Sequence, residues 1–241
     1  MDRSLFLDVN RLTRQSAWAH GVMRFLAHDA GVAIIALLVL ASFLRVRSPW
    51  RNASLERVAS VLWIPVGVAI AAAAGELVAH VVARTPPALA VHSAAVLVAV
   101  SAHHGSLPSE SVVIAGAAAA GLWLAGERVI AMLATAVALL LAFDEVYVGS
   151  HYPGDVAAGL ALGTIVTVAG YAISEPWLAK LVERAARGPL APIVGVDLAR
   201  PLVTAGPASA PTQLRATGSV RILGRDELAY GRGASPDVTG S

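Results

Sequence analysis

The sequence contains no cysteine and is poor in charged and aromatic side chains. Without cysteine, a disulfide framework, a zinc–thiolate site and a cysteine nucleophile are all excluded. Charged residues make up 14% of the chain, whereas a soluble domain typically carries about 25%. Aromatic residues account for 5% and hydrophobic residues for 56%, and the mean hydropathy is +0.68. This composition predicts a protein embedded in lipid.

Five uncharged apolar runs predict membrane-spanning helices. They cover residues 30–44, 58–75, 111–126, 129–143 and 156–174, and flanking residues can extend them toward the ~20 residues that a span needs. Residues 88–107 also lack Asp, Glu, Lys and Arg, but two prolines open the stretch and three histidines interrupt it. We favour a loop there over a sixth span. The fold class is therefore an all-α, polytopic membrane bundle of five to six spanning helices.

The ends of the chain differ in character from this membrane domain, which we assign to residues 29–180. Residues 1–28 place apolar side chains at helical spacing, as in an amphipathic helix that lies on the membrane surface. Residues 181–241 become rich in Pro, Gly, Ser, Thr and Ala without a periodic apolar face, which predicts a disordered tail.

The basic residues indicate an orientation in the membrane. Arginines occupy the segment between the first two expected spans, and Lys180, Arg184 and Arg187 follow the last span. Because cytoplasmic loops are enriched in Lys and Arg, these segments and the C-terminus are expected in the cytoplasm. The chain is then a multi-pass cell-membrane protein with residues 79–87, 106–111 and 144–155 at its outer face. Membrane lipids are the expected surroundings, and nucleic acid is not an expected partner.

The most informative outer segment contains His151 and Asp155. Residues four apart share one face of a helix. A carboxylate bonded to one imidazole nitrogen fixes the tautomer and leaves the other nitrogen free as a nucleophile or base. Polar capping of a helix at the membrane interface is the alternative interpretation of this pair.

Three segments in this order resemble the signatures of the type 2 phosphatidic acid phosphatase superfamily, which includes lipid phosphatases and haloperoxidase-like proteins. VYVGSHYPGDVAA at residues 146–158 resembles the third signature, SLPSES at residues 106–111 the second, and AHVVARTPP at residues 79–87 the first. The spacing and the opening SLFLDVNRL are most similar to the bacterial undecaprenyl-diphosphatase branch. The resemblance covers roughly residues 4–180.

The resemblance implies hydrolysis of a lipid phosphate or polyprenyl diphosphate without a metal or other cofactor. His151 would attack phosphorus and form a phosphohistidine, with Asp155 orienting the imidazole. Ser109 matches the serine that helps bind the phosphoryl oxygens.

The signatures are degenerate at several positions. Ser111 stands where the family has its general-acid histidine, and Ala79 and Pro86 replace a lysine and an arginine. Asp144 and Glu145 replace the Ser-Arg pair of the third signature. Loss of a positioned general acid alone typically costs about 10²–10⁴ in rate.

Neighbouring residues offer a rewired site. Arg84 could clamp the phosphate, and His80 or His104 could supply the acid. The alternative for each is an ordinary interfacial side chain. Two functions therefore remain: a lipid phosphatase with an altered site, and a catalytically impaired homologue that binds a lipid or a membrane protein.

Overall fold

The computed structural model describes residues 2–48, 54–99 and 105–188. The chain divides into two units, Met1–Pro201 and Leu202–Ser241, and the second unit lies outside the described residues. The expected tail at residues 181–241 is therefore described only at its start. There the last helix continues to Ala186, six residues into the segment predicted to be disordered.

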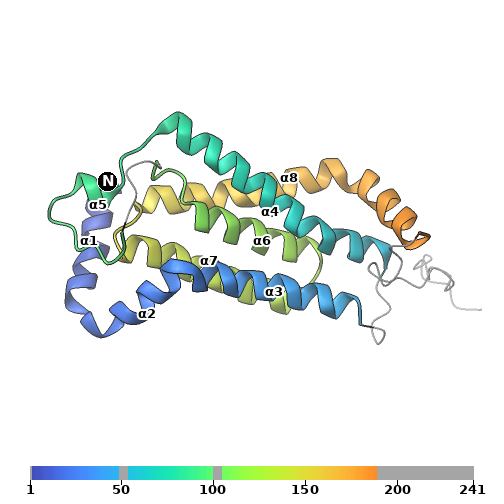
Figure 1. Cartoon of the computed structure of the whole chain (residues 1–241), viewed down its shortest axis with the longest axis horizontal. Coiled ribbons are helices and arrows are strands. Elements are labelled where there is room, and N and C mark those ends of the chain that lie inside the picture. The colour runs from blue at the N-terminus through green and yellow to red at the C-terminus, as the bar shows by residue number, and fades with distance from the viewer. Residues whose placement is uncertain (1, 49–53, 100–104, 189–241) are drawn as a thin grey trace, which may run out of the picture. The chain divides into compact units, whose positions relative to one another are not determined.

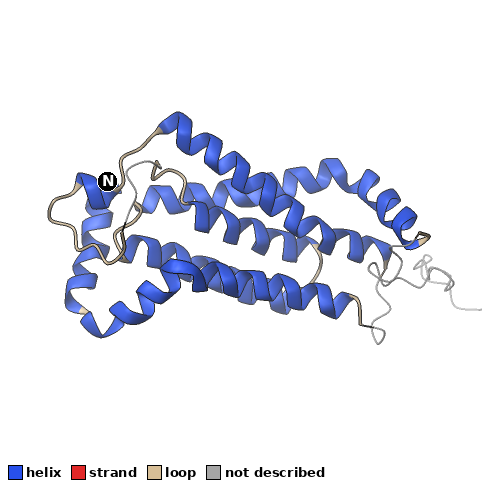
Figure 2. Cartoon of the chain, viewed as in Figure 1, coloured by secondary structure: helices blue, strands red, loops and turns tan. Residues whose placement is uncertain are grey.

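The described residues form helices and loops, with no strand among them (Figure 2). The α-helices are α1 (Asp2–Gln15), α2 (His20–Phe25), α3 (Gly31–Val46), α4 (Leu55–Val82), α5 (Pro87–Ala90), α6 (Glu110–Leu124), α7 (Arg128–Tyr147) and α8 (Pro153–Ala186). A 3₁₀ turn at Ala17–Ala19 and a π-helical turn at Leu26–Ala30 join α1, α2 and α3. The predicted all-α membrane bundle is confirmed.

Each of the five predicted apolar runs coincides with one helix. Among the described residues, α4, α7 and α8 are long and apolar enough to cross a bilayer, while α3 and α6 are apolar but shorter. Within the segment 88–107 that is expected as a loop, residues 88–90 belong to the short helix α5 and residues 91–99 contain no helix, while residues 100–104 lie outside the described residues. A helix satisfies its own backbone hydrogen bonds, and this is why apolar runs in lipid adopt it so reliably.

Small residues let the helices of the bundle approach one another closely. Most of α6 is buried, and it packs against α3, α4, α7 and α8 (Figure 1). A Cβ atom at Gly163 of α8 would lie 2.2 Å from the carbonyl oxygen of Val113 in α6. At Gly116 of α6 a Cβ atom would lie 3.1 Å from the Leu160 carbonyl oxygen. Glycine at both positions therefore permits the α6–α8 contact.

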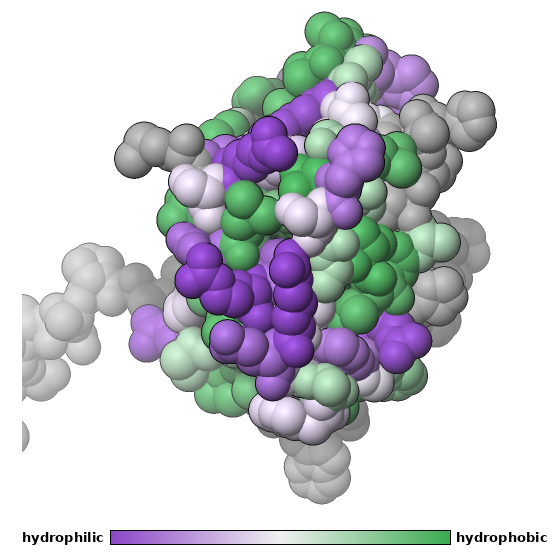
Figure 3. Space-filling view, turned by 90° about the vertical axis from the view of Figure 1, so that its left-hand side faces the viewer, coloured by the Kyte–Doolittle hydropathy of each residue, from purple (hydrophilic) through white to green (hydrophobic). Residues whose placement is uncertain are grey.

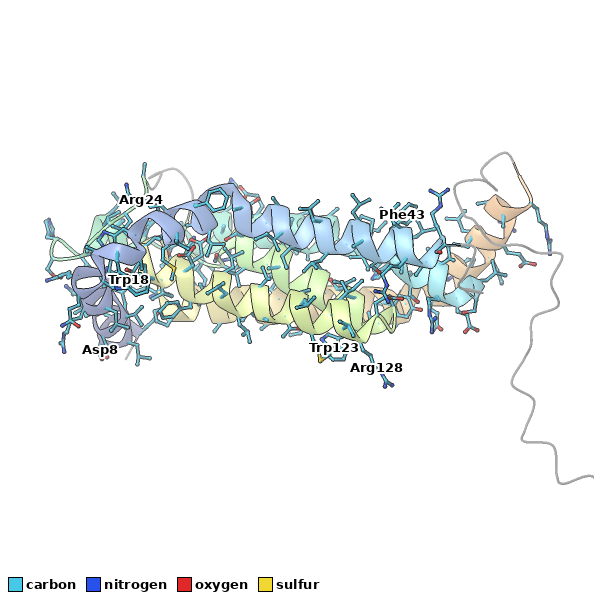
Figure 4. The ribbon with its side chains drawn as sticks, turned by 90° about the horizontal axis from the view of Figure 1, so that it is seen from below. Asp8, Trp18, Arg24, Phe43, Trp123 and Arg128 are labelled. Atoms are coloured by element: carbon cyan, nitrogen blue, oxygen red, sulfur yellow. The ribbon has the colours of Figure 1, made fainter. Side chains whose placement is uncertain are left out.

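Helix α1 lies across one end of the bundle, where it packs against α7 and α8 (Figure 1). Asn10 is fully buried and pairs with both backbone groups of Ala95, at 2.7 and 2.8 Å. Thr13, also buried, donates to the carbonyl oxygen of Tyr147 at 2.7 Å. Trp18, which is 86% exposed, lies at this end with Asp8 and Arg24, as Figure 4 shows. The bonds of Asn10 and Thr13 fix α1 over the loop that follows α5 and over the end of α7.

Candidate active site

The structure brings the three signature segments together at the α1 end of the bundle. The backbone N–H of Ser106 donates to the carbonyl oxygen of Arg84 at 2.8 Å. The backbone N–H of Ser109 donates to the carbonyl oxygen of Asp155 at 3.2 Å. The first, second and third segments are thus joined by main-chain hydrogen bonds. Hydrophilic side chains gather on this end of the molecule, between apolar patches (Figure 3).

A left-handed residue positions Arg84. Helix α4 ends at Val82, and Ala83 follows with φ of 46° and ψ of 42°. An L-residue with a Cβ atom pays about 1–2 kcal/mol for this conformation. The turn is secured by a hydrogen bond from the Ala83 N–H to the Ala79 carbonyl oxygen at 2.9 Å. It redirects the chain so that Arg84 lies beside the start of α8.

His151 has one imidazole nitrogen fixed and the other free of a close hydrogen bond among the described residues. Its Nδ1 lies 2.7 Å from the carbonyl oxygen of Ser106. Because a carbonyl oxygen only accepts, Nδ1 carries a proton, and in the neutral imidazole the lone pair is then on Nε2. The side chain is 19% exposed, so Nε2 is sheltered but reachable. This is the tautomer that a nucleophilic imidazole requires.

The predicted pairing of Asp155 with His151 takes a different form. Asp155 Oδ2 lies 4.0 Å from His151 Nδ1, beyond hydrogen-bond distance. That oxygen instead accepts the backbone N–H of Tyr152 at 2.9 Å, at the beginning of α8. Oδ1 accepts from Arg84 Nη1 at 2.5 Å. The main-chain oxygen of Ser106 therefore orients the imidazole, and Asp155 caps the helix and holds Arg84.

Arg84 is engaged by two carboxylates and one aromatic ring. Its Nη1 donates to Asp155 and its Nη2 donates to Asp2 Oδ2, each at 2.5 Å. The guanidinium carbon lies 4.0 Å from the centroid of the Tyr152 ring, a cation–π arrangement. Partial burial opposes the charge, but the hydrogen bond that Arg84 donates to Asp2 and the negative charges of Asp155 and Asp2 outweigh it and raise the pKa of Arg84.

A cavity of about 240 Å³ opens beside His151. Its described lining residues are Gly75, Glu76, Ala79, Gly105, Pro108, Glu110, Ser111 and His151, and none of them is a lysine or arginine. The lining therefore includes the candidate nucleophile and the residue at the general-acid position. Its charged members, Glu76 and Glu110, are acidic.

Glu145 connects Ser111 and His151, the cavity residues at the general-acid and nucleophile positions. Glu145 is 6% exposed, and its Oε1 accepts a hydrogen bond from the Ser111 hydroxyl at 2.5 Å. Its Oε2 lies 3.9 Å from His151 Nε2. The buried Ser109 hydroxyl lies 3.3 Å from the Ser111 hydroxyl and continues the chain of polar groups. A carboxylate thus occupies the place where the family signature carries an arginine.

Of the two predicted acid candidates, the one that the structure describes does not join this group. His80 Nδ1 lies 2.9 Å from the Glu76 carbonyl oxygen and 3.3 Å from a Glu76 carboxylate oxygen, along its own helix. His104 lies outside the described residues. Within the described part of the chain, no group of three or more His, Asp and Glu side chains is placed to hold a metal ion.

Sequence reasoning did not identify two participants of the site. The Ser106 carbonyl is a main-chain group, for which side-chain patterns give no signal. Asp2 reaches Arg84 from a position 82 residues earlier in the chain. A single acidic residue at the start of an amphipathic helix also has the ordinary role of favouring the helix dipole.

Comparisons with known proteins assign the family. The sequence model of the PAP2 superfamily matches residues 60–178. In structure the chain is similar to a transmembrane PAP2-type phosphatidylglycerolphosphate phosphatase from Bacillus subtilis, with 19% identity, 72% of this chain and 86% of that chain covered, and a TM-score of 0.52. It is also similar to LpxE from Aquifex aeolicus, with 18% identity, 69% and 94% covered, and a TM-score of 0.45. No curated protein matches the chain. The resemblance found in the three sequence segments is confirmed, and the chain belongs to the PAP2 superfamily of type 2 phosphatidic acid phosphatases.

Proposed function

We propose that this protein hydrolyses a lipid phosphate at the membrane surface, with His151 as the nucleophile. The observation that carries the proposal is the hydrogen bond from His151 Nδ1 to the Ser106 carbonyl oxygen, which directs the lone pair to Nε2. His151 also lines the cavity at the end of an apolar bundle. A substrate whose tail stays in lipid can present its phosphate there.

The reaction that follows has two steps. Nε2 of His151 bonds to phosphorus as the bond from phosphorus to the lipid oxygen breaks, and the lipid alkoxide takes a proton from water. Water then attacks the phosphohistidine, which releases inorganic phosphate and restores the imidazole. Such a transfer depends mainly on positioning and on stabilisation of the phosphoryl charge.

The electrostatics of the cavity predict slow turnover. Glu76 and Glu110 line it, and Glu145 lies beside the nucleophile. Ser111, at the acid position, is bonded to Glu145. With no general acid there, we expect a rate about 10²–10⁴ below that of family members with complete signatures.

A second candidate function is favoured by the position of Glu145. Because its Oε2 lies 3.9 Å from Nε2 of His151, it repels a phosphoryl group that approaches the nucleophile. A homologue of this kind binds a lipid or a membrane protein at the same end without turnover.

The orientation of the bundle supports an outer-face site. Arg45 belongs to the last turn of α3, where it lies 3.5 Å from Glu127, and Arg57 belongs to the first turn of α4. These ends of α3 and α4 lie at the end of the bundle opposite to the start of α8, which follows His151 in the chain (Figure 1). By the positive-inside rule, that end is cytoplasmic and the His151 end faces out. The C-terminus, after α8, is then cytoplasmic.

Phosphate release by the purified full chain tests the two functions. The substrates are phosphatidic acid, undecaprenyl diphosphate and phosphatidylglycerol phosphate, each compared with the His151→Ala variant. Release that disappears in the variant supports the phosphatase. Equal background release from both folded proteins, on all three substrates, would leave only the binding function.

A further inference from the structure

The guanidinium of Arg84 joins two carboxylates that differ in how firmly they are held. Asp155 has no exposed side-chain surface, and its second oxygen accepts the backbone N–H of Tyr152. Asp2 belongs to the first turn of α1, and its side chain is 32% exposed. Of the two anions, Asp2 is the one that can leave Arg84 without opening the bundle.

The Asp2 carboxylate is also bound by the N-terminus of α8. Its Oδ1 accepts the backbone N–H of Gly154, the second residue of the 34-residue helix α8, at 2.8 Å. The first N–H groups of a helix have no partner within the helix, and the helix dipole favours an anion beside them. Asp2 therefore receives an arginine donor and a helix N–H donor at once.

Gly154 makes room for this anion. A Cβ atom built at Gly154 would lie 2.9 Å from Asp2 Oδ2 and 3.3 Å from Asp2 Cγ. Any side chain at this position would push the carboxylate away from both donors. Gly154 thus shapes a cradle for the carboxylate between its own N–H and the Arg84 guanidinium. The Tyr152 ring stacks on Arg84 and keeps the guanidinium in place.

The rest of α1 is fixed independently of Asp2. Asn10 makes two hydrogen bonds with Ala95, and Thr13 bonds to Tyr147. Phe6 packs edge-on against the Tyr152 ring, with centroids 5.5 Å apart. The first turn can therefore move while the second half of the helix stays docked.

We propose that Arg84 and the Gly154 N–H form an anion site for a phosphate monoester, and that the Asp2 carboxylate fills this site as a built-in competitor. A phosphate carries more charge than a carboxylate and offers three oxygens to the guanidinium and the helix N–H. It displaces Asp2 when its local concentration is high enough. The proposal concerns binding, and it holds whether or not His151 supports turnover.

The first test measures the affinity for inorganic phosphate by calorimetry, with the full chain in phosphatidylcholine nanodiscs. Removal of an internal competitor raises the apparent affinity by the inverse of the fraction of open sites. We expect Asp2→Ala to bind phosphate at least about 10-fold more tightly than the parent. Asp8→Ala is the matched control, because Asp8 lies exposed on the same helix, 3.8 Å from Arg11. It should bind like the parent.

Two further variants locate the binding. Gly154→Ala, which fills the cradle, and Arg84→Gln are each introduced into the Asp2→Ala variant. Each should abolish the increase in phosphate affinity that Asp2→Ala alone produces. Unchanged affinity in Asp2→Ala, or a gain that persists in the Arg84→Gln background, would overturn the proposal.

A second measurement distinguishes a lipid headgroup from free phosphate and does not depend on any variant folding. Amide hydrogen exchange of residues 2–9 in the parent protein is compared in nanodiscs with and without phosphatidic acid, and with added inorganic phosphate. Faster exchange with either probe supports displacement of Asp2, and the probe that acts identifies the source of the phosphate. Unchanged exchange with both probes contradicts it.

Discussion

The Nε2 atom of His151 lies 3.9 Å from Oε2 of Glu145, and Glu145 accepts a hydrogen bond from Ser111 on its other oxygen. A nucleophilic nitrogen must come within about 3–3.5 Å of phosphorus. A carboxylate so close to the attacking atom raises the energy of the bound phosphate, whereas an arginine would lower it. In the proposed reaction, the relationship between these two residues therefore limits the rate of phosphoryl transfer.

Restoring the family residues at this point should increase activity. In the double variant Ser111→His with Glu145→Arg, a general acid returns and a repelling charge becomes an attracting one. We expect phosphate release from phosphatidic acid to rise about 10²-fold or more. The same pair of substitutions in the His151→Ala background should stay at background level. A folded double variant that releases no more phosphate than the parent would contradict this prediction.

Asp155 should matter more to stability than Asp2. Its carboxylate is fully buried between Arg84 and the Tyr152 N–H, so Asp155→Asn weakens two charge-assisted hydrogen bonds at a buried position, while Arg84 keeps its bond to Asp2. Such a loss typically costs about 1–3 kcal/mol. Asp2→Asn removes a partly exposed charge and should cost less than about 1 kcal/mol. Reversible unfolding in mixed micelles compares the two free energies, and equal losses would refute the assignment.

The α6–α8 contact should be sensitive to a single methyl group. Gly163→Ala places Cβ against the Val113 carbonyl oxygen at 2.2 Å, where only backbone movement can relieve the clash. We expect a loss of about 1–3 kcal/mol in the free energy of unfolding. Gly75→Ala in α4 is the control, because its nearest neighbour would be a Val113 side-chain carbon at 3.5 Å. An equal loss in both variants would contradict the packing argument.

Ala83→Gly should stabilise the protein. Ala83 has φ of 46°, a left-handed conformation that glycine adopts without the steric cost of a Cβ atom. Removal of this cost should raise the free energy of unfolding by about 1 kcal/mol. Ala73→Gly, within the regular part of α4, should change it by a similar amount in the opposite direction. A lower free energy of unfolding for Ala83→Gly than for the parent would contradict the steric cost assigned to Ala83.

The absence of native cysteine makes the membrane orientation directly measurable, because any introduced cysteine is the sole label site. A membrane-impermeant maleimide should label Ser93→Cys, at the α1 end, in intact cells. It should label Ser48→Cys, which follows α3 at the other end, only after permeabilisation. The reverse pattern would place the candidate site in the cytoplasm.

The sequence by itself determined the helical membrane bundle. Five apolar runs match α3, α4, α6, α7 and α8 because lipid leaves backbone groups no partner except those within a helix. Three short segments in the right order were sufficient to predict the family. They also predicted the site residues His151, Asp155, Ser109 and Arg84. The substitutions at Ser111 and Glu145 were also visible, because each alters a fixed position of a signature.

Only the tertiary structure decided how these residues pair. Asp155 and His151 share a helical spacing, yet His151 bonds to the Ser106 carbonyl oxygen, and Asp155 turns to Tyr152 and Arg84. Asp2 reaches Arg84 across 82 residues because α1 docks over the start of α8. A hydrogen bond forms or fails over less than 1 Å. Helix packing sets side-chain positions on that scale, and they cannot be predicted from the local sequence.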